Sequence, residues 1–454
     1  MKIPALFDDR KFYRDLFVLA LPIMFQSLIN SLVSLIDTIM VGRLGTNEIA
    51  AVGLANQIFF LYDLLLYGIC SGAAIFTAQF WGKKDIAGIR KNMGLCLTIS
   101  FFAAALFFFP SMFKPETLIG IYSPDPAVVE AGAAYLKAVS PSFFPFAISM
   151  VFGLTLRSVE KVRLAFVVAV IALFLSGILN FLFIFGAGPI PAMGVVGAAR
   201  ATLISRIVQA LVLVAVSYYK RYVPAGSLKE IFGFNRQYVR QFLPITVPVM
   251  LNEMFWSLGI TLQHLIFART STDAVAAVNI TNTVSMLTWV MFLGLGSSVS
   301  VLIGKKIGER DEKTARAYAS KVVRFVPLLA VAAAMILYPI SLLFPFVFNV
   351  NPETLALASR MFIILCCAYP FRSFNMTMVI GICRAGGDTV FCAFYDIALM
   401  WLFTLPLMAF AGFVLGAPVW VLYLFIGVEA PFKALIGLWR FKTGKWLRSV
   451  TDGL

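Results

Sequence analysis

The sequence predicts an all-α membrane protein, in which twelve transmembrane helices form two six-helix lobes related by a parallel internal repeat. Three observations predict this fold class: the composition, the spacing of the apolar stretches and an internal duplication. Hydrophobic residues make up 61% of the 454 residues and charged residues 13%, whereas soluble proteins have roughly 45–50% apolar and about 25% charged residues. This composition excludes a soluble globular protein.

Twelve stretches of the chain are long and apolar enough to cross a bilayer, which takes about 20 residues in a helix. Each stretch is bounded by charged residues, Gly or Pro. In chain order, the predicted helices lie near 15–41, 49–80, 93–113, 132–157, 164–186, 194–218, 241–268, 274–304, 323–348, 359–383, 390–414 and 417–439.

An internal duplication divides these helices into two sets of six. Residues 22–85 align without a gap on residues 248–311, and fifteen positions are identical, among them Pro22 and Pro248. Because six is an even number, both copies cross the membrane in the same sense, and a pseudo-twofold axis along the membrane normal relates them. Duplicated bundles of this kind are common among secondary transporters.

The charged residues set the orientation and the boundaries of the lobes. The Lys and Arg residues behind the formal net charge of +15 lie mostly in alternate loops. The positive-inside rule places these loops and both termini in the cytoplasm. We expect an N-terminal lobe over 1–218, a cytoplasmic linker over 219–240 and a C-terminal lobe over 241–454. We also expect a monomer in a bacterial-type inner (plasma) membrane, in contact with the lipid bilayer and without bound nucleic acid.

Asp37, late in the first span, is the main candidate for chemistry. An unpaired carboxylate inside an apolar segment costs several kcal/mol, so it must be protonated, hold a cation or face water. Ser176 and Asn180 in the fifth span share one helix face, and Thr202 lies in the sixth. These neutral oxygens complete a site for H+ or Na+ if they meet Asp37; otherwise they are ordinary hydrogen-bonding residues between helices.

Four further polar residues are candidates for a substrate site or a second cation site. Glu253 lies in the seventh span, and the alternative is that it reaches the cytoplasmic interface. Asp63 interrupts the second span. Gln263 stands where the first copy has Asp37, and His264, the only histidine, is a candidate proton relay or a packing residue.

Other charged residues in apolar sequence have no assigned role. Asp396 and Glu429 have no partner that the pattern identifies, and Arg384 with Asp388 is interpreted as a structural ion pair. The six cysteines lack metal-ligand spacing, so no firm metal site is expected apart from a possible Na+ at Asp37. With one histidine and no nucleophile motif, we expect neither an enzyme nor a cofactor.

Several segments together resemble the multidrug and toxic compound extrusion (MATE) transporters. They are LPIMFQSLINSLVSLIDTIMVGRLG, IAAVGLANQ, NFLFIFG, GVVGAARAT and RAGGDT. The resemblance covers nearly the whole chain and implies two six-helix lobes around a central cleft. Members of this family expel cationic or lipophilic drugs in exchange for H+ or Na+.

The resemblance also implies roles for individual residues. Asp37 matches the first-helix acid of the family, with Asn180, Ser176 and Thr202 completing its cation site. Glu253 matches the seventh-helix acid of Na+-coupled members, although Ser373 stands near the position of their tenth-helix acid. Pro22 resembles the proline at which some members bend the first helix.

The predicted function is a secondary active multidrug efflux antiporter that works by alternating access, with small-molecule drugs as substrates and H+ or Na+ as the coupling ion. The alternative is a flippase for lipid-linked saccharides, which needs several arginines facing the central cleft to hold pyrophosphate. Arg200 and Arg372 are the only deep candidates for that role. The sequence therefore favours the antiporter.

Overall fold

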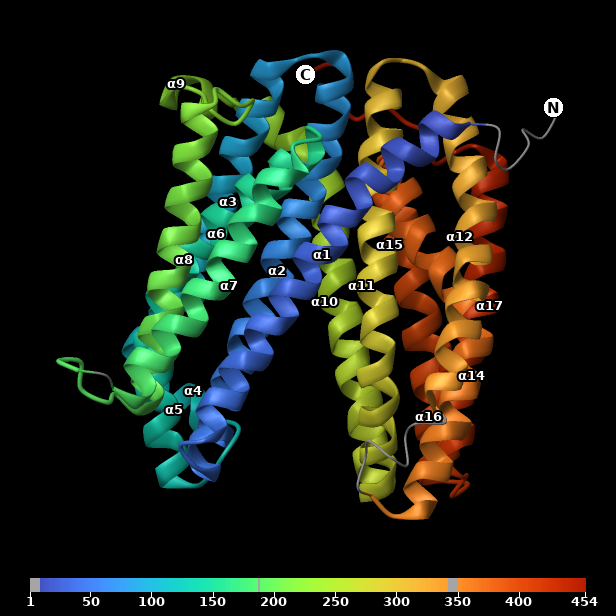
Figure 1. Cartoon of the computed structure of the whole chain (residues 1–454). Coiled ribbons are helices and arrows are strands. Elements are labelled where there is room, and N and C mark those ends of the chain that lie inside the picture. Colours follow the sequence, from blue (N-terminus) through green and yellow to red (C-terminus); the bar gives the residue numbers. More distant parts are fainter. Residues whose placement is uncertain (1–8, 187, 342–349) are drawn as a thin grey trace. The chain divides into compact units, whose positions relative to one another are not determined.

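The computed structural model describes residues 9–186, 188–341 and 350–454, and helices make up most of this part of the chain (Figure 1). The helices are α1 (Arg10–Gly42), α2 (Thr46–Lys83), α3 (Ile86–Phe113), α4 (Pro115–Gly120), α5 (Pro126–Val139), α6 (Phe143–Ser158), α7 (Val162–Phe185), α8 (Gly194–Tyr219), α9 (Leu228–Ile231), α10 (Arg236–Thr270), α11 (Thr272–Gly308), α12 (Glu312–Ser341), α14 (Pro352–Met376), α15 (Thr389–Leu399), α16 (Leu405–Phe413) and α17 (Val419–Thr443).

Twelve segments of the described chain are long and apolar enough to cross a membrane, which confirms the predicted number. Three of the predicted spans are interrupted helices. The span at 132–157 contains a 3₁₀ turn, η1 (Ser140–Ser142), and those at 359–383 and 390–414 contain the π-helical segments η2 (Thr377–Cys383) and η3 (Met400–Thr404). The last residues of the span at 323–348 lie outside the described part.

The chain packs as two compact units whose boundaries fall inside helices. Residues Phe25–Met250 form one, here called the N-terminal unit. Residues up to Met24, together with Leu251–Gly453, form the C-terminal unit. Met24 and Met250 occupy the same position in the two sequence copies. Helices α1 and α10 therefore each pass from one unit to the other, at equivalent places.

Close backbone contacts fix the first half of each of these two helices. In the N-terminal unit, a Cβ on Gly68 of α2 would lie 2.7 Å from the Met250 Cα of α10. In the C-terminal unit, a Cβ on Gly294 of α11 would lie 3.2 Å from the Met24 nitrogen of α1. Gly68 and Gly294 are equivalent in the repeat. Glycine at both positions lets the helix backbones approach, as small residues do in membrane proteins.

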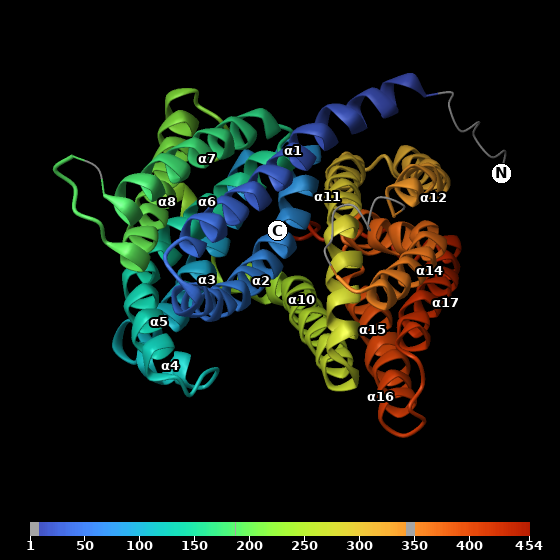
Figure 2. The same cartoon turned by 60° about the horizontal axis from the view of Figure 1, so that its bottom comes forward.

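Within the N-terminal unit, α7 and α8 lie side by side, and α2 packs against α3, α5 and α6 (Figures 1 and 2). The Tyr62 hydroxyl of α2 donates to the Phe143 carbonyl of α6 at 2.7 Å. This packing places α1, α2, α7 and α8 around the acids described below.

The predicted linker is docked on the N-terminal unit. Arg90 of α3 donates to the Val223 carbonyl at 3.2 Å and the Ala225 carbonyl at 2.5 Å, and it pairs with Glu230 of α9 at 3.0 Å. A Cβ on Gly94 would lie 1.8 Å from the Ile231 carbonyl oxygen, so α9 rests directly on α3. The linker is therefore a packed element.

Candidate functional site

Asp37 meets the residues of α7 that the sequence analysis selected. The Asn180 side-chain amide donates to Asp37 Oδ1, and the Ser176 hydroxyl lies within reach of the same carboxylate. Asn180 is fully buried and Ser176 is 3% exposed. Because the two residues are one helical turn apart, one face of α7 presents both to Asp37.

The Asn180 side-chain oxygen, Oδ1, is buried and has no hydrogen-bond partner within the described chain. A buried amide oxygen without a donor carries a desolvation cost of about 1–3 kcal/mol. This oxygen, beside the Asp37 carboxylate, is a ready acceptor for a hydrated proton or a small cation.

Arg206 of α8 is a site residue that the sequence analysis missed. Its guanidinium carbon lies 4.0 Å from the ring centre of Phe59 and 4.6 Å from that of Phe146, both cation–π contacts. Its positive charge acts on both Asp37 and Asp63. The charge of one guanidinium therefore acts on two carboxylates, which leaves one negative charge in excess when both acids are ionised.

Thr202 is linked to the Asp37 carboxylate only indirectly, through Tyr135. Its hydroxyl forms a hydrogen bond with the phenol of Tyr135 in α5, and the charge of Asp37 acts on this phenol. The structure thus assembles Asp37, Ser176 and Asn180 directly, whereas Thr202 reaches the acid through Tyr135.

The candidates of the seventh span have partners of their own in the C-terminal unit. Glu253 Oε1 lies 2.5 Å from a guanidinium nitrogen of Arg384, and the Glu253 side chain is 12% exposed. His264 is exposed; its Nδ1 lies 3.0 Å from the Ile260 carbonyl and its Nε2 lies 3.2 Å from Asn282. Gln263 is buried at 5% exposure. Glu253 is therefore held by a cation of this chain.

Two interpretations of arginines are wrong. Asp388 is not the partner of Arg384: it accepts from Arg440 of α17, with distances of 2.7 Å and 2.9 Å to its two oxygens. Arg200 is exposed and approaches the Met193 sulfur, while Arg206 takes the inward position on the same helix. Partner choice depends on helix rotation, which loop position alone does not determine.

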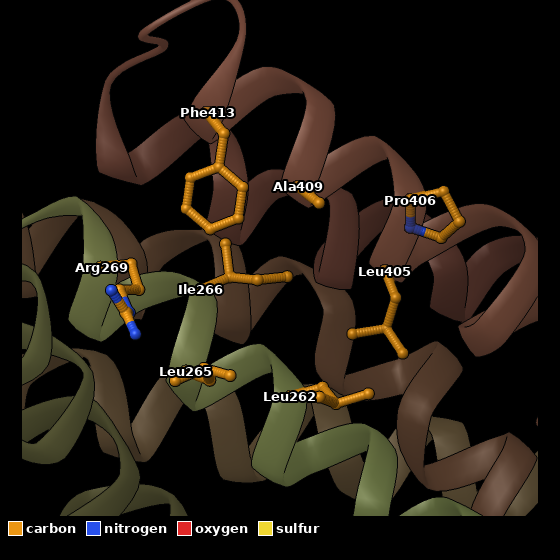
Figure 3. Close-up of a pocket in the computed structure, with 8 residues that line it drawn as sticks. All are labelled: Leu262, Leu265, Ile266, Arg269, Leu405, Pro406, Ala409 and Phe413. Carbon is orange, nitrogen blue, oxygen red and sulfur yellow. The ribbon is translucent and has the colours of Figure 1, made fainter.

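A groove of about 730 Å³ in the C-terminal unit lies between α10 and α16 (Figure 3). Arg269 is the one charged residue in its lining, and no carboxylate contributes to it. The lining residues are Leu262, Leu265, Ile266, Arg269, Leu405, Pro406, Ala409 and Phe413. Such a surface suits lipid tails and other apolar molecules but holds no coupling ion.

Among the described residues, no three His, Cys, Asp or Glu side chains gather in a metal-binding arrangement. The oxygens that meet at the Asp37 site belong to Asp37, Asn180 and Ser176.

Comparisons with known proteins identify relatives over nearly the whole chain. A family model described as MatE matches residues 22–182 and again 248–410, so both matches start at the aligned prolines. The uncharacterized transporter YisQ of Bacillus subtilis is 26% identical over 427 residues, which cover 93% of this chain and 92% of YisQ. The probable multidrug resistance protein NorM of Thermotoga maritima is 25% identical over 447 residues, 95% of this chain and 93% of NorM.

Solved structures give the same fold. One, an outward-facing conformation of a multidrug resistance MATE family transporter of the MOP superfamily, matches with a TM-score of 0.82 at 21% identity. It covers 98% of this chain and 99% of that chain. A MATE structure in complex with MaD3S matches with a TM-score of 0.84 at 20% identity, again over 98% of this chain and 99% of that one. These matches confirm the predicted fold class.

Proposed function

The chain belongs to the MatE family of membrane transporters, and we propose that it exports cationic or lipophilic small molecules by exchanging them for protons. Like the other members of this family, it is a transporter and not an enzyme. Relatives named as multidrug resistance proteins support a broad range of substrates. The observation that carries the proposal is the enclosure of the Asp37 carboxylate within an apolar span against buried Asn180, because a proton neutralises such a carboxylate without further ligands.

Proton uptake on Asp37 changes both the charge and the hydrogen bonding of the site. The ionised carboxylate attracts a cationic substrate and accepts the hydrogen bond from Asn180. When Asp37 takes up a proton, the site loses its excess negative charge, so its attraction for the cation falls. The substrate then leaves on the outer side, and the transporter returns to the inner side with Asp37 still protonated and the site neutral. Each proton that returns inward across a membrane potential of 100 mV supplies about 2.3 kcal/mol.

The flippase alternative requires free guanidinium groups for a pyrophosphate. Among the inward arginines of the described chain, Arg206 packs on two aromatic rings and its charge acts on two carboxylates, and Arg384 is paired with Glu253. Arg157 donates to Gln26, and Arg372 bonds the Tyr423 phenol. Each of these guanidinium groups already has a partner in this chain. This pairing favours the antiporter.

We further propose that the protein acts as a monomer in the plasma membrane, with both termini in the cytoplasm. The basic loops support this orientation through the positive-inside rule. A reagent that labels thiols and cannot cross membranes, applied to single-cysteine variants at Arg10 and Arg448 in intact cells, is expected to label neither.

Transport of ethidium in proteoliposomes tests the proposed function. We expect an imposed pH gradient to drive ethidium transport by the parent, and an imposed Na+ gradient at constant pH to leave it unchanged. Asp37→Asn is expected to lose this pH-driven transport. Asp15→Asn is its matched control, because Asp15 lies on the same helix α1 and forms an exposed pair with Arg14. Ethidium movement driven by neither gradient would refute antiport, and movement driven only by Na+ would refute the proton.

A further inference from the structure

The C-terminal unit buries a second group of charges, centred on Lys433 of α17. The Lys433 ammonium donates to Asp396 Oδ1 at 2.7 Å and pairs with Glu429 Oε1 at 2.6 Å. The three residues are between 5% and 8% exposed. Two carboxylates thus share one ammonium, again with one negative charge in excess when both are ionised.

Neighbouring charges do not cancel this excess. Glu253 and Arg384 form a balanced pair, which Asn252 connects to the group by donating to Asp396 at 3.2 Å and accepting from Arg384 at 3.3 Å. The phenol of Tyr395, on which the charge of Asp396 acts, lies near the thiols of Cys383 and Cys392, and none of these three groups is a cation. On α14, Arg372 and Tyr369 face Tyr423 instead.

An unbalanced charge inside a membrane segment is unfavourable. A proton on one of the two carboxylates removes this cost. A sodium ion does not suit the position, because the carboxylate oxygens that would bind it already contact Lys433, Asn252, Asn375 and Thr404.

The hydrogen bonds indicate which carboxylate takes the proton. Asp396 accepts from three donors: Lys433, Asn252 and Asn375. Glu429 has two neighbours, Lys433 on one oxygen and the Thr404 hydroxyl at 2.5 Å on the other. Fewer donors therefore stabilise the ionised form of Glu429 than that of Asp396, so Glu429 is the acid that takes the proton.

The π-helical segment η3 gives the proton an acceptor. Thr404, its last residue, has its hydroxyl oxygen 2.5 Å from Glu429 Oε2 and 3.4 Å from the carbonyl oxygen of Leu399, five residues earlier. A hydroxyl donates one hydrogen bond and accepts two. When Glu429 is protonated, it can donate to Thr404 while Thr404 donates to Leu399. Short π-helical segments are frequent at functional sites.

From this geometry we propose that Glu429, supported by Lys433, Asp396 and Thr404, is a second proton-binding site that contributes one further proton to the exchange. The proton binds to Glu429 Oε2. Glu429 then donates a hydrogen bond to the Thr404 hydroxyl instead of accepting one from it. Asp396 stays paired with the Lys433 ammonium. The coupling part of this inference rests on the proposed proton antiport, whereas proton binding itself does not.

Infrared difference spectroscopy of the purified protein tests proton binding without a substrate. Between low and high pH, the parent is expected to lose the carbonyl stretch of one protonated carboxyl group from this site. Glu429→Gln and Asp396→Asn each leave a single carboxylate for Lys433, so both variants should lack that contribution. Lys433→Met leaves two carboxylates without a cation and should increase it. The proposal is wrong if Glu429→Gln keeps the signal of the parent.

The number of protons exchanged per ethidium tests coupling. In proteoliposomes, the pH gradient that balances a fixed ethidium gradient gives this ratio. We expect Glu429→Gln to exchange one proton fewer than the parent, and an unchanged ratio would contradict a coupling role for Glu429. A parent that moves no ethidium would refute the proposed function, while the infrared result would still decide whether Glu429 binds a proton.

Discussion

At the scale of single residues, Arg206 determines how the acids of the N-terminal unit are balanced. Its charge acts on Asp37 and Asp63 while its guanidinium packs on Phe59 and Phe146. An arginine inside an apolar span is unusual enough to be a functional candidate. The same rule that selected Asp37 from the sequence would have selected Arg206.

Replacing Arg206 by Gln is expected to leave two carboxylates without a cation. Loss of one partner from a buried charge group typically costs about 3–5 kcal/mol, so we expect a strong loss of folded protein and at least a tenfold loss of ethidium transport. The double variant Arg206→Gln with Asp63→Asn restores the balance of one negative charge. It should recover folded protein, measured by size-exclusion chromatography. Equal yields of the single variant and the parent would show that Arg206 does not balance these acids.

The sequence predicted part of the site because certain signals are local. Asp37 interrupts an apolar stretch, and the spacing of Ser176 and Asn180 puts both on one face of α7. Glu429 and Lys433 are also spaced by four residues, a local signal that pairs these two side chains in a helix. The pair of Asp388 with Arg440 joins residues 52 positions apart, so it follows only from the packing of α15 against α17.

At the scale of elements, Asp9 fixes the start of α1 to α12. It accepts the Phe12 backbone N–H at 3.0 Å and pairs with Lys321 of α12 at 2.8 Å. The hydrogen bond from Lys321 lowers the pKa of Asp9, despite partial burial, which opposes the shift. A carboxyl whose pKa is lowered by folding stabilises the protein above its unfolded pKa, and this stabilisation disappears as the pH falls through the folded pKa.

Asp9→Asn is therefore expected to lower thermal stability at neutral pH, by about 1 kcal/mol for a cap and a partly exposed pair. The difference from the parent should stay constant above about pH 5 and shrink below about pH 4, the ordinary carboxyl pKa, because Asp9 is then protonated in the unfolded state before it is protonated in the folded one. Thermal unfolding in detergent, followed by circular dichroism across this range, measures it. A difference that grows at low pH would contradict the pairing.

The docked linker is an element whose structure the sequence did not reveal, because its polar residues and glycines are equally typical of a free connection. Arg90→Ala removes three contacts to the segment between α8 and α10. The two bonds from the Arg90 guanidinium to the Val223 and Ala225 carbonyls contribute about 1.5–3 kcal/mol each, so we expect trypsin to cleave this segment at least tenfold faster. Lys91→Ala, on the same helix, is the control. Equal cleavage rates for Arg90→Ala and the parent would show that Arg90 does not hold the linker.

At the scale of the whole molecule, the repeat predicted the equivalence of the two copies but not how they share helices. Twelve spans follow from hydropathy alone, whereas the unit boundaries after Met24 and Met250 depend on close contacts at Gly294 and Gly68. Each boundary lies two residues after an aligned proline, Pro22 or Pro248. Proline removes a backbone hydrogen bond within a helix and so favours a bend there.

We expect Pro22→Ala and Pro248→Ala to stiffen α1 and α10 where they change units. Both variants should unfold at a higher temperature than the parent and transport ethidium several-fold more slowly. Pro244→Ala is the control, since Pro244 lies in the same helix α10 but farther than Pro248 from the unit boundary after Met250. A similar loss of transport in all three variants would mean that the position of the proline relative to the boundary is irrelevant.

The proposed exchange depends most on the proton that Asp37 takes up as substrate leaves and gives up as substrate arrives. Proton movement out of proteoliposomes after addition of ethidium to the outside, compared between the parent and Asp37→Asn, measures this directly. We predict ethidium-dependent proton movement in the parent and at least a tenfold smaller signal in Asp37→Asn, with Asp15→Asn equal to the parent. Full ethidium-dependent proton movement in Asp37→Asn would contradict the role assigned to this carboxylate.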